Sequence, residues 1–590
     1  MKMRCLFVRS ALIIFFLSMA TGSHAQSVFG TCEIDSWNAC SSNLAAFCQV
    51  VGLPFALTGM DKVAGTVLRA PHLAGVQVQR PIRLYLLLGS GTKSTTPSSV
   101  AALPLIDNGT AYLASLRNTF QTITTNASIS LFSNPDEPRT PAEHLAVLIT
   151  NQVALVGETA EDVAALALAL RTNGVPVFEK LSADLRIGLD MARLAPLLEQ
   201  GSKVMRHQMA QQPMPNQPGQ PEPAKLVGSE LDAALAIARQ IRQISLGVKV
   251  DGANATLLIR VDPISGSILA AAMQETRPPS ERYTRLLPAN ALFGVAGGGL
   301  TAANVLIKPY ANFIVQFYKG IPGMADKGIA VRDLLLQSTA LYTGDYALEI
   351  QSDNRANGVF FAEIIAVSDA DQARKGIRNN IALATQAETN APLGFCTVAL
   401  PDRAYAGAEI QSYSYRTQTH SMDPMEQRLM PAAMILSFLT NCTFEQTVVG
   451  KDLLVTVGRA GAMDQLIDRV KQGGDSQFYD TTRSLFSDTA QQPTEVSRLD
   501  LSAAISTLLP MLPGDFGNRM PQLPPGRGLG TLTMRQDHSM LMMMRISTPE
   551  VRSLVQAVSV MMMPPPRSLP AGMNHPSGMP AAPSSDPHGF

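Results

Sequence analysis

The sequence has few aromatic side chains and no excess of charge of either sign. Tryptophan occurs once, as Trp37, and aromatic residues make up 6% of the 590-residue chain. An aromatic-lined carbohydrate-binding surface is therefore disfavoured, and an aliphatic core is expected. Lysine and arginine together number 47, as do aspartate and glutamate. This balance gives no reason to expect nucleic acid or an anionic membrane as a partner.

The sequence also lacks the short motifs of common catalytic and metal sites. It contains no Gly-x-Ser-x-Gly, no His-Glu-x-x-His and no Cys-x-x-Cys. After residue 25 the histidines stand singly, at positions 72, 144, 207, 420, 538, 575 and 588, unlike paired helical metal ligands. We therefore predict no catalytic residue, no cofactor and no metal site.

Three features resemble ligand sites but have simpler interpretations. The glycine-rich run 294–299 follows a strand, yet it matches neither a dinucleotide fingerprint nor a P-loop, so we interpret it as a close-packed turn. Asp369 and Asp371 begin a helix, where carboxylates usually complement the helix dipole. A low-complexity tail contains side chains that could bind copper, namely Met573, His575, Met579 and His588.

The first 25 residues have the pattern of a secretory signal peptide. Lys2 and Arg4 precede an apolar run over 11–17, and Ser23-His24-Ala25 supplies a small-residue boundary. That run is shorter than the ~20 residues that span a bilayer, and no later run reaches this length. We predict cleavage after Ala25 and a secreted or periplasmic protein with no transmembrane segment.

Two distant segments share one pattern. Residues 246–271 read LGVKVDGANATLLIRVDPISGSILAA, and residues 529–554 read LGTLTMRQDHSMLMMMRISTPEVRSL. Each is predicted to be a β-hairpin followed by a helix. The consecutive methionines of the second segment predict a strand that is buried on both faces.

Other segments match in the same order, with Gly157 aligned to Gly458 and Leu189 to Leu501. The repeated order predicts an internal duplication. The predicted fold class is α+β, with two similar units, each a mainly antiparallel sheet covered by helices.

The predicted organisation follows from these patterns. A Cys-bearing helical arm over 26–51 precedes a first unit over 52–280 and a second unit over 281–563. A flexible Pro/Gln-rich loop over 208–223 interrupts the first unit, and a Pro/Met-rich tail over 564–590 is predicted to be disordered.

Five cysteines follow residue 25. Cys396 and Cys442 lie in strand-like segments of the second unit, and an exported protein meets an oxidising compartment, so we predict a disulfide between them. Cys32, Cys40 and Cys48 are too widely spaced for a zinc site, and their pairing is left open.

The matched segments carry a resemblance. RPIRLYLLL with VAALPLIDNGTAYLASL, and TGDYALEI with FAEIIAVSDADQARKGI, resemble the exported, duplicated proteins of unknown function found in planctomycete and verrucomicrobial bacteria. LLPANALFGV similarly opens a segment with a Leu-Pro strand. The resemblance covers most of residues 54–560. It implies an exported bacterial protein and brings no catalytic residues.

These observations favour a non-enzymatic exported protein that binds an unknown protein or an envelope component. One alternative is a carrier of an apolar ligand between sheet and helices, which the Leu/Met-rich strands suggest. Another is an exported hydrolase whose site becomes visible only in three dimensions.

Overall fold

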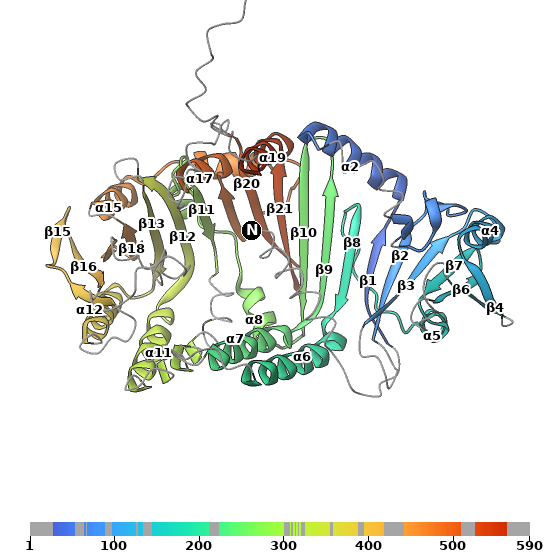
Figure 1. Ribbon diagram of the computed structural model, residues 1–590. Helices are drawn as coiled ribbons and strands as arrows, with labels where there is room; N and C mark the ends of the chain where they lie inside the picture. Colours follow the sequence, from blue (N-terminus) through green and yellow to red (C-terminus); the bar gives the residue numbers. More distant parts are fainter. Residues whose placement is uncertain are drawn as a thin grey trace, which may run out of the picture.

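A computed structural model gives the fold. It describes residues 27–53, 64–66, 68–88, 97–125, 128–133, 144–211, 223–299, 307, 311–312, 314–316, 318–319, 325–353, 358–386, 395–417, 442–458, 461–508 and 526–562. The described chain combines helices with a large antiparallel sheet, which confirms the α+β class and the mainly antiparallel sheet (Figure 1). The predicted signal peptide over 1–25 and the predicted tail over 564–590 lie outside the described residues.

One continuous sheet runs through the described chain, and every strand pair in it is antiparallel. In spatial order the strands of its first half are β4 (Gln121–Thr125), β5 (Ile129–Ser133), β6 (His144–Thr150), β7 (Val153–Gly157), β3 (Ser98–Pro104), β2 (Ile82–Leu88), β1 (Ser27–Ile34), β8 (Leu185–Asp190), β9 (Ile241–Val250) and β10 (Asn254–Pro263).

The second half continues from β10 without a break. Its strands are β21 (Ser539–Ser547), β20 (Leu529–Gln536), β19 (Glu495–Leu499), β11 (Phe293–Gly297), β12 (Tyr342–Asp353), β13 (Gly358–Val367), β18 (Asp452–Gly458), β17 (Thr443–Val449), β16 (Ala408–Thr417) and then β14 (Phe395–Ala399) and β15 (Arg403–Tyr405), which both pair with β16. The predicted boundary at 280/281 falls between α8 and α9, so β10 lies in the predicted first unit and β21 in the second.

Helices flank the ends and faces of the sheet. Along one end of the central strands lie α2 (Trp37–Val51), α17 (Leu501–Leu508) and α19 (Thr548–Met562), and along the other lie α6 (Met191–Gln211), α7 (Pro223–Ala238), α8 (Ile268–Glu275) and α11 (Ala325–Thr339) (Figure 1). The remaining helices are η2 (Pro71–Leu73), α4 (Thr110–Thr119), α5 (Ala160–Arg171), α9 (Glu281–Arg285), α12 (Ala370–Gln386), α15 (Ala462–Gln472) and α16 (Gln477–Ser484). None of the helices in the described part of the chain has the length and apolar character to cross a membrane.

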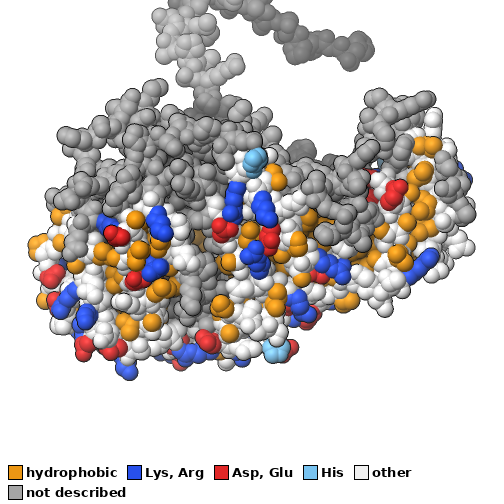
Figure 2. Space-filling model, turned by 90° about the horizontal axis from the view of Figure 1, so that it is seen from below, with side chains coloured by type: hydrophobic (Ala, Val, Ile, Leu, Met, Phe, Trp, Pro, Cys, Tyr) orange, Lys and Arg blue, Asp and Glu red, His pale blue; other side chains and the backbone are white. Residues whose placement is uncertain are grey.

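Both predicted hairpins are present, because their alternation of apolar and polar residues is a local signal. β9 and β10 lead into α8, and β20 and β21 lead into α19. Basic and acidic side chains are interspersed on the molecular face seen from below, where α6 and α7 lie (Figure 2). The described side chains on that face therefore form no extended field of one sign.

Burial alternates along the central strands. On β10, Leu258 and Arg260 are buried, whereas Leu257 and Ile259 beside them are half-buried. Side chains point alternately to the two faces of a strand, so one face is closely packed and the other is partly open.

The methionine-rich strand β21 follows this alternation in part. On its packed face Leu541 and Arg545 are buried and Met543 is half-buried, while Met540, Met542 and Met544 are half-buried on the other face. The prediction of a strand buried on both faces is therefore wrong, because the methionines remain partly exposed.

The predicted helical arm over 26–51 needs a correction. Its second part is helix α2, as expected, and Ser36 caps the helix by accepting a hydrogen bond from the Ala39 amide at 3.3 Å. Residues 27–34, however, form strand β1, which lies between β2 and β8. Long-range pairing with two neighbouring strands, which the local sequence does not reveal, places this segment inside the sheet.

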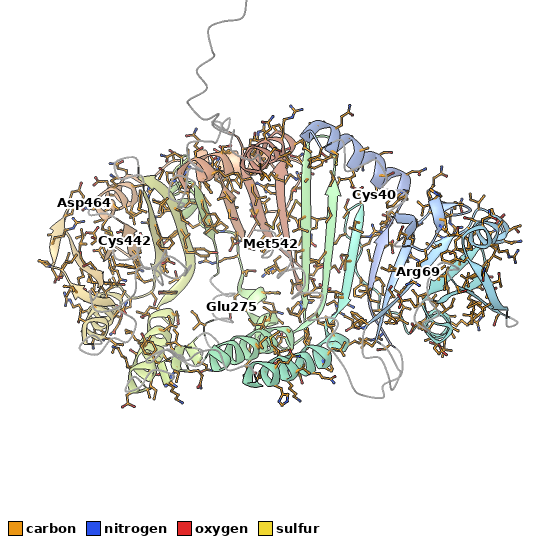
Figure 3. The ribbon with its side chains drawn as sticks, viewed as in Figure 1. Cys40, Arg69, Glu275, Cys442, Asp464 and Met542 are labelled. Atoms are coloured by element: carbon orange, nitrogen blue, oxygen red, sulfur yellow. The ribbon has the colours of Figure 1, made fainter. Side chains whose placement is uncertain are left out.

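The two cysteines of the predicted disulfide lie on or beside strands that are not neighbours in the sheet. Cys396 on β14 lies opposite Arg416 of β16, and Cys442 immediately precedes β17, which pairs with the other side of β16. Two strands separated by a third lie roughly 10 Å apart, whereas the Cα atoms of a disulfide are about 4.4–6.8 Å apart. This strand order does not favour the bond, and the pairing of Cys396 with Cys442 stays a prediction. Cys442 and Cys40 lie in opposite halves of the molecule (Figure 3).

Candidate functional site

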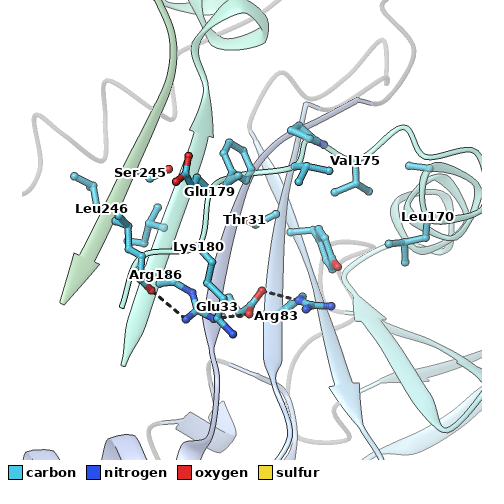
Figure 4. A pocket seen from close by; sticks show the side chains of 18 of the residues that line it. Thr31, Glu33, Arg83, Leu170, Val175, Glu179, Lys180, Arg186, Ser245 and Leu246 are labelled. Atoms are coloured by element: carbon cyan, nitrogen blue, oxygen red, sulfur yellow. Dashed lines mark hydrogen bonds and ion pairs between the residues drawn. The ribbon is translucent and has the colours of Figure 1, made fainter. Parts of the chain in front are cut away.

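The segment 173–181, which we call the strap, connects α5 to β8 across the packed face of the sheet. Between the strap and the sheet is a cavity of about 520 Å³ (Figure 4). Strands β1, β2, β8 and β9 supply its floor, and the end of α5 supplies Leu170. Five elements that are distant in the sequence therefore meet at this cavity.

A glycine in the floor allows the strap to lie close to the sheet. A Cβ atom at Gly188 would lie 2.3–2.7 Å from ring carbons of Phe178, so the aromatic ring rests directly on the backbone of β8. Phe178, Val175, Pro176 and Leu181 of the strap form an apolar wall of the cavity. One side of the cavity thus suits an apolar ligand group.

Hydrogen bonds hold the strap at several points. Arg193 Nη1 donates to the carbonyl oxygen of Gly174 at 3.1 Å, at the start of the strap. Gln243 Nε2 donates to the carbonyl oxygen of Val177 at 3.2 Å, near its middle. Near its other end, Glu179 forms an ion pair with the buried Arg260 at 2.5 Å between Oε2 and Nη2. These contacts position the strap over the cavity.

The floor of the cavity consists of two rows of cross-strand neighbours. Glu33 lies opposite both Arg83 and Arg186 in one row. Gly188 lies opposite both Thr31 and Ser245 in the other. Residues two apart on a strand share a face, so both rows point toward the strap.

An alternating series of charges runs along the first row and continues to the strap. Arg83 Nε lies 2.7 Å from Glu33 Oε2, and Glu33 Oε1 lies 2.5 Å from Arg186 Nη2. Arg186 Nη1 donates to Asp35 Oδ2 at 2.6 Å, and Lys180 Nζ lies 3.3 Å from Asp35 Oδ1. We call these five residues the ion chain. It contains three cations and two carboxylates, and it begins and ends with a cation.

The ion chain shifts the pKa values of Asp35 and Arg186 away from neutral pH. Hydrogen bonds from Arg186 lower the pKa of Asp35 to about 2. The same hydrogen bonds raise the pKa of Arg186 above its usual value. Burial raises the pKa of Tyr85, the floor residue two positions beyond Arg83. An acid–base catalyst works best with a pKa near the operating pH, so these shifts suit binding better than proton transfer.

A hydroxyl group in the floor has no hydrogen-bond partner. Ser245 is 4% exposed, and within the described part of the chain nothing accepts from or donates to its Oγ. Leaving a buried hydroxyl unpaired costs about 1–3 kcal/mol. A bound ligand or a water molecule could supply the missing partner.

A second cavity, of about 410 Å³, adjoins the first. The two share Lys180, Leu181 and Arg186, and the second is also lined by Asp184 and Lys249. A single ligand could therefore contact both cavities on either side of Lys180.

The connection between α15 and β19 in the other half of the sheet is built differently. It contains α16, and its side chains Phe478 and Phe486 are 1% and 0% exposed. Leu181 packs beside Leu258, while Leu485 and Phe486 lie in the cluster that includes Met543. The strap contains no such helix, and the cavity lies beneath it.

The residues that the sequence singled out have structural roles where they are described. Gly294 and Gly297 lie in β11, where Phe478 and Tyr346 pack directly against their backbones. The close packing is as interpreted, but the two glycines are in a strand and not a turn. Asp369 Oδ1 accepts hydrogen bonds from the backbone amides of Asp371 and Gln372, at 2.9 and 3.0 Å, which is the behaviour of a helix cap. The four tail residues lie outside the described chain.

The sequence analysis missed the ion chain. Glu33, Arg83 and Arg186 are ordinary polar positions in alternating strands. The one available signal was a charged residue on the same face as a small or aromatic one, as in Arg186 with Gly188 and Arg83 with Tyr85. The pairing of three distant strands brings these three together, and the end of β1 and the strap add Asp35 and Lys180.

No family model matches the chain, and neither the curated proteins nor the solved structures contain a match. Among the residues described above, no group of three or more His, Cys, Asp or Glu side chains is placed to hold a metal ion.

Proposed function

We propose that the protein is a non-enzymatic exported binding protein and that the cavity beneath the strap holds a ligand with an apolar body and an anionic group. The end members of the ion chain carry the proposal. The side chains of Arg83 and Lys180 are 46% and 70% exposed, so both can reach a ligand. The ion chain has one more cation than it has carboxylates, which favours a negatively charged ligand group beside it.

This proposal joins two of the functions that the sequence allows. The apolar wall formed by the strap favours a carrier of an apolar ligand, and the ion chain adds a polar end to that ligand. A hydrolase is supported less well, because Glu33 and Asp35 are held by arginine and lysine side chains. Carboxylates bound in this way are poor general acids and bases at neutral pH.

We further propose that the chain arose by duplication, and the strand order supports this. Read outward from the β10–β21 junction, the order β10, β9, β8, β1, β2, β3, β7, β6 corresponds to β21, β20, β19, β11, β12, β13, β18, β17. The ion pairs Arg260–Glu179 and Arg545–Asp488 occupy corresponding places on the packed face. The ligand cavity described above would then lie in the first unit.

Export is proposed from the sequence pattern of residues 1–25. N-terminal sequencing of the protein recovered from an exporting host should begin at Gln26. Recovery of an intact Met1 on membrane-bound protein would contradict this.

Ligand binding can be tested with 8-anilinonaphthalene-1-sulfonate, a fluorescent probe with apolar rings and one negative charge. Wild-type protein should bind it with saturable fluorescence. Arg83→Gln and Lys180→Gln should each raise the dissociation constant about fivefold, which corresponds to roughly 1 kcal/mol. Arg80→Gln is the matched control, because Arg80 is exposed and lies outside the cavity lining. Equal affinities for all four proteins would contradict the proposal.

A further inference from the structure

We propose that the anionic group of the ligand is a phosphate monoester held between Lys180 and Lys249 in the second cavity, while the apolar body lies under the strap. The ligand class would then be a phosphorylated amphiphile. This inference rests on the proposed function, because it names the chemistry of the same site. Its starting point is that the two cavities adjoin each other at Lys180, Leu181 and Arg186.

The carboxylates of the second cavity are already occupied by donors within the protein. Asp184 Oδ1 accepts from Asn43 Nδ2 at 3.2 Å, and Asp184 Oδ2 accepts from the Val250 amide at 3.0 Å. Both oxygens of Asp35 are bound by Arg186. These carboxylates fix the walls of the cavity. The charge of Asp35 is paired with Arg186 and Lys180, whereas Asp184 accepts only from neutral donors among the described residues and keeps its negative charge.

The lysines of this cavity are differently placed. Lys180 shares Asp35 with Arg186, and its side chain is 70% exposed. Lys249 forms no ion pair with any carboxylate in the described part of the chain, and it is exposed. Its described electrostatic neighbour across the sheet is Asp488, which is itself bound by Arg545 at 2.7 Å. Positive charge at the cavity is therefore available to a ligand.

A phosphate monoester fits this arrangement better than a carboxylate does. It carries a charge of about −1.5 to −2 at neutral pH and three strong acceptor oxygens, enough for two ammonium groups at once. Lysine binds phosphate as a compact point charge and needs no fixed planar geometry. A carboxylate has one charge, and one lysine would already satisfy it.

Competition against the fluorescent probe tests the inference with the full-length protein. Dodecyl phosphate, dodecanoate and inorganic phosphate are each titrated into the protein–probe complex at pH 7.5. Dodecyl phosphate should displace the probe at a concentration at least tenfold lower than dodecanoate, which has the same kind of chain and a single charge. Inorganic phosphate should displace it poorly, because it lacks the apolar body.

The variant Lys249→Gln tests the second cavity alone, because Lys249 does not line the first. It should weaken dodecyl phosphate about tenfold and should weaken dodecanoate and the fluorescent probe much less, because Lys180 alone can satisfy their single charge. Lys203→Gln is the matched control, because Lys203 is an exposed lysine on α6 that lines neither cavity.

The outcomes distinguish this inference from the proposed function. If the probe and dodecanoate bind but dodecyl phosphate has no advantage, or Lys249→Gln leaves that advantage intact, the phosphate assignment is overturned and the proposed function stands. Tight displacement by inorganic phosphate alone would show a site for free phosphate and overturn the amphiphile. If neither the probe nor any amphiphile binds, the proposed function fails.

Discussion

Leu258 of β10 and Met543 of β21 lie directly opposite each other where the two halves of the sheet join. On either side of them, Leu257 faces Met544 and Ile259 faces Met542. Leu258 lies opposite Gly247 in the first hairpin, and Met543 lies opposite Leu532 in the second. The same length of chain separates the two residues of each pair, so Leu258 and Met543 are equivalent within the proposed duplication. The junction is then arranged about a local two-fold axis through this pair, as in a symmetric dimer.

Removing the side chain at this junction should destabilise the protein. Leu258 is 6% exposed and packs with Leu181 of the strap and Leu541 of β21. Leu258→Ala should lower the free energy of unfolding by about 2–5 kcal/mol, through lost burial and the resulting cavity. Urea unfolding measures this change.

Two variants serve as controls for the junction. Leu258→Met places the proposed equivalent residue at the same position and should cost less than about 1.5 kcal/mol, because it conserves volume. Leu168→Ala removes a leucine that is 62% exposed and should change the stability by about 0.5 kcal/mol at most. A loss for Leu258→Ala no larger than that for Leu168→Ala would contradict the packing described here.

A methyl group at Gly188 should disturb the strap. Its Cβ atom would meet the Phe178 ring at 2.3–2.7 Å, so the ring and the strap must move away from β8. Gly188→Ala should cost about 1–3 kcal/mol from overpacking and should weaken binding of the fluorescent probe. At Gly252 nothing lies within 4 Å of an added Cβ atom, so Gly252→Ala is the control and should leave probe binding unchanged.

The elements that the sequence predicted are those with a local signal. The hairpins at 241–263 and 529–547 are confirmed because period-two alternation and polar turns are visible within about twenty residues. Alignment of the proposed repeats was less accurate. The strand registers make Asp190 equivalent to Asp500. The sequence alignment of Leu189 with Leu501 is shifted from this correspondence by two residues. Both aspartates accept a hydrogen bond from the amide three residues later, at 3.2 and 3.0 Å.

The elements that the sequence did not predict depend on which strands become neighbours. Strand β16 lies between the strands of Cys396 and Cys442, and nothing near either cysteine indicates it. The candidate site has the same origin, because Glu33 meets Arg186 only through the pairing of β1 with β8. Register between distant strands is set by the assembled sheet, so a local reading cannot recover it.

The ion chain should make stability depend on pH in the acid range. Arg186 lowers the pKa of Asp35 to about 2 in the folded protein, below the ~3.9 of an unfolded aspartate. The stabilisation is therefore complete above the unfolded value and is lost as the pH falls toward 2.

Asp35→Asn removes this contribution. Because the Asp35 side chain is 40% exposed, solvent screening should limit the difference from wild type to about 1 kcal/mol at pH 7. The difference should persist down to about pH 5 and disappear near pH 2. Urea unfolding can be followed through Trp37, the single tryptophan, which is two residues from Asp35 and 8% exposed. A difference that grows toward acid pH would contradict the assigned shift.

Removing the Ser245 hydroxyl should weaken ligand binding without lowering the stability of the protein. The group is buried without a partner among the described residues, so Ser245→Ala relieves an unpaired hydroxyl and should leave the stability unchanged or raise it by up to about 1 kcal/mol. If the hydroxyl bonds to the ligand, the same variant should weaken probe binding several-fold.

Ser412 is the matched control for Ser245. It is also 4% exposed, and its Oγ likewise has no partner in the described chain. It lies on β16, which is far from the cavity in the strand order of the sheet. Ser412→Ala should affect stability in the same direction and leave probe binding unaltered. Equal probe affinities for the two variants and wild type would remove Ser245 from the proposed site.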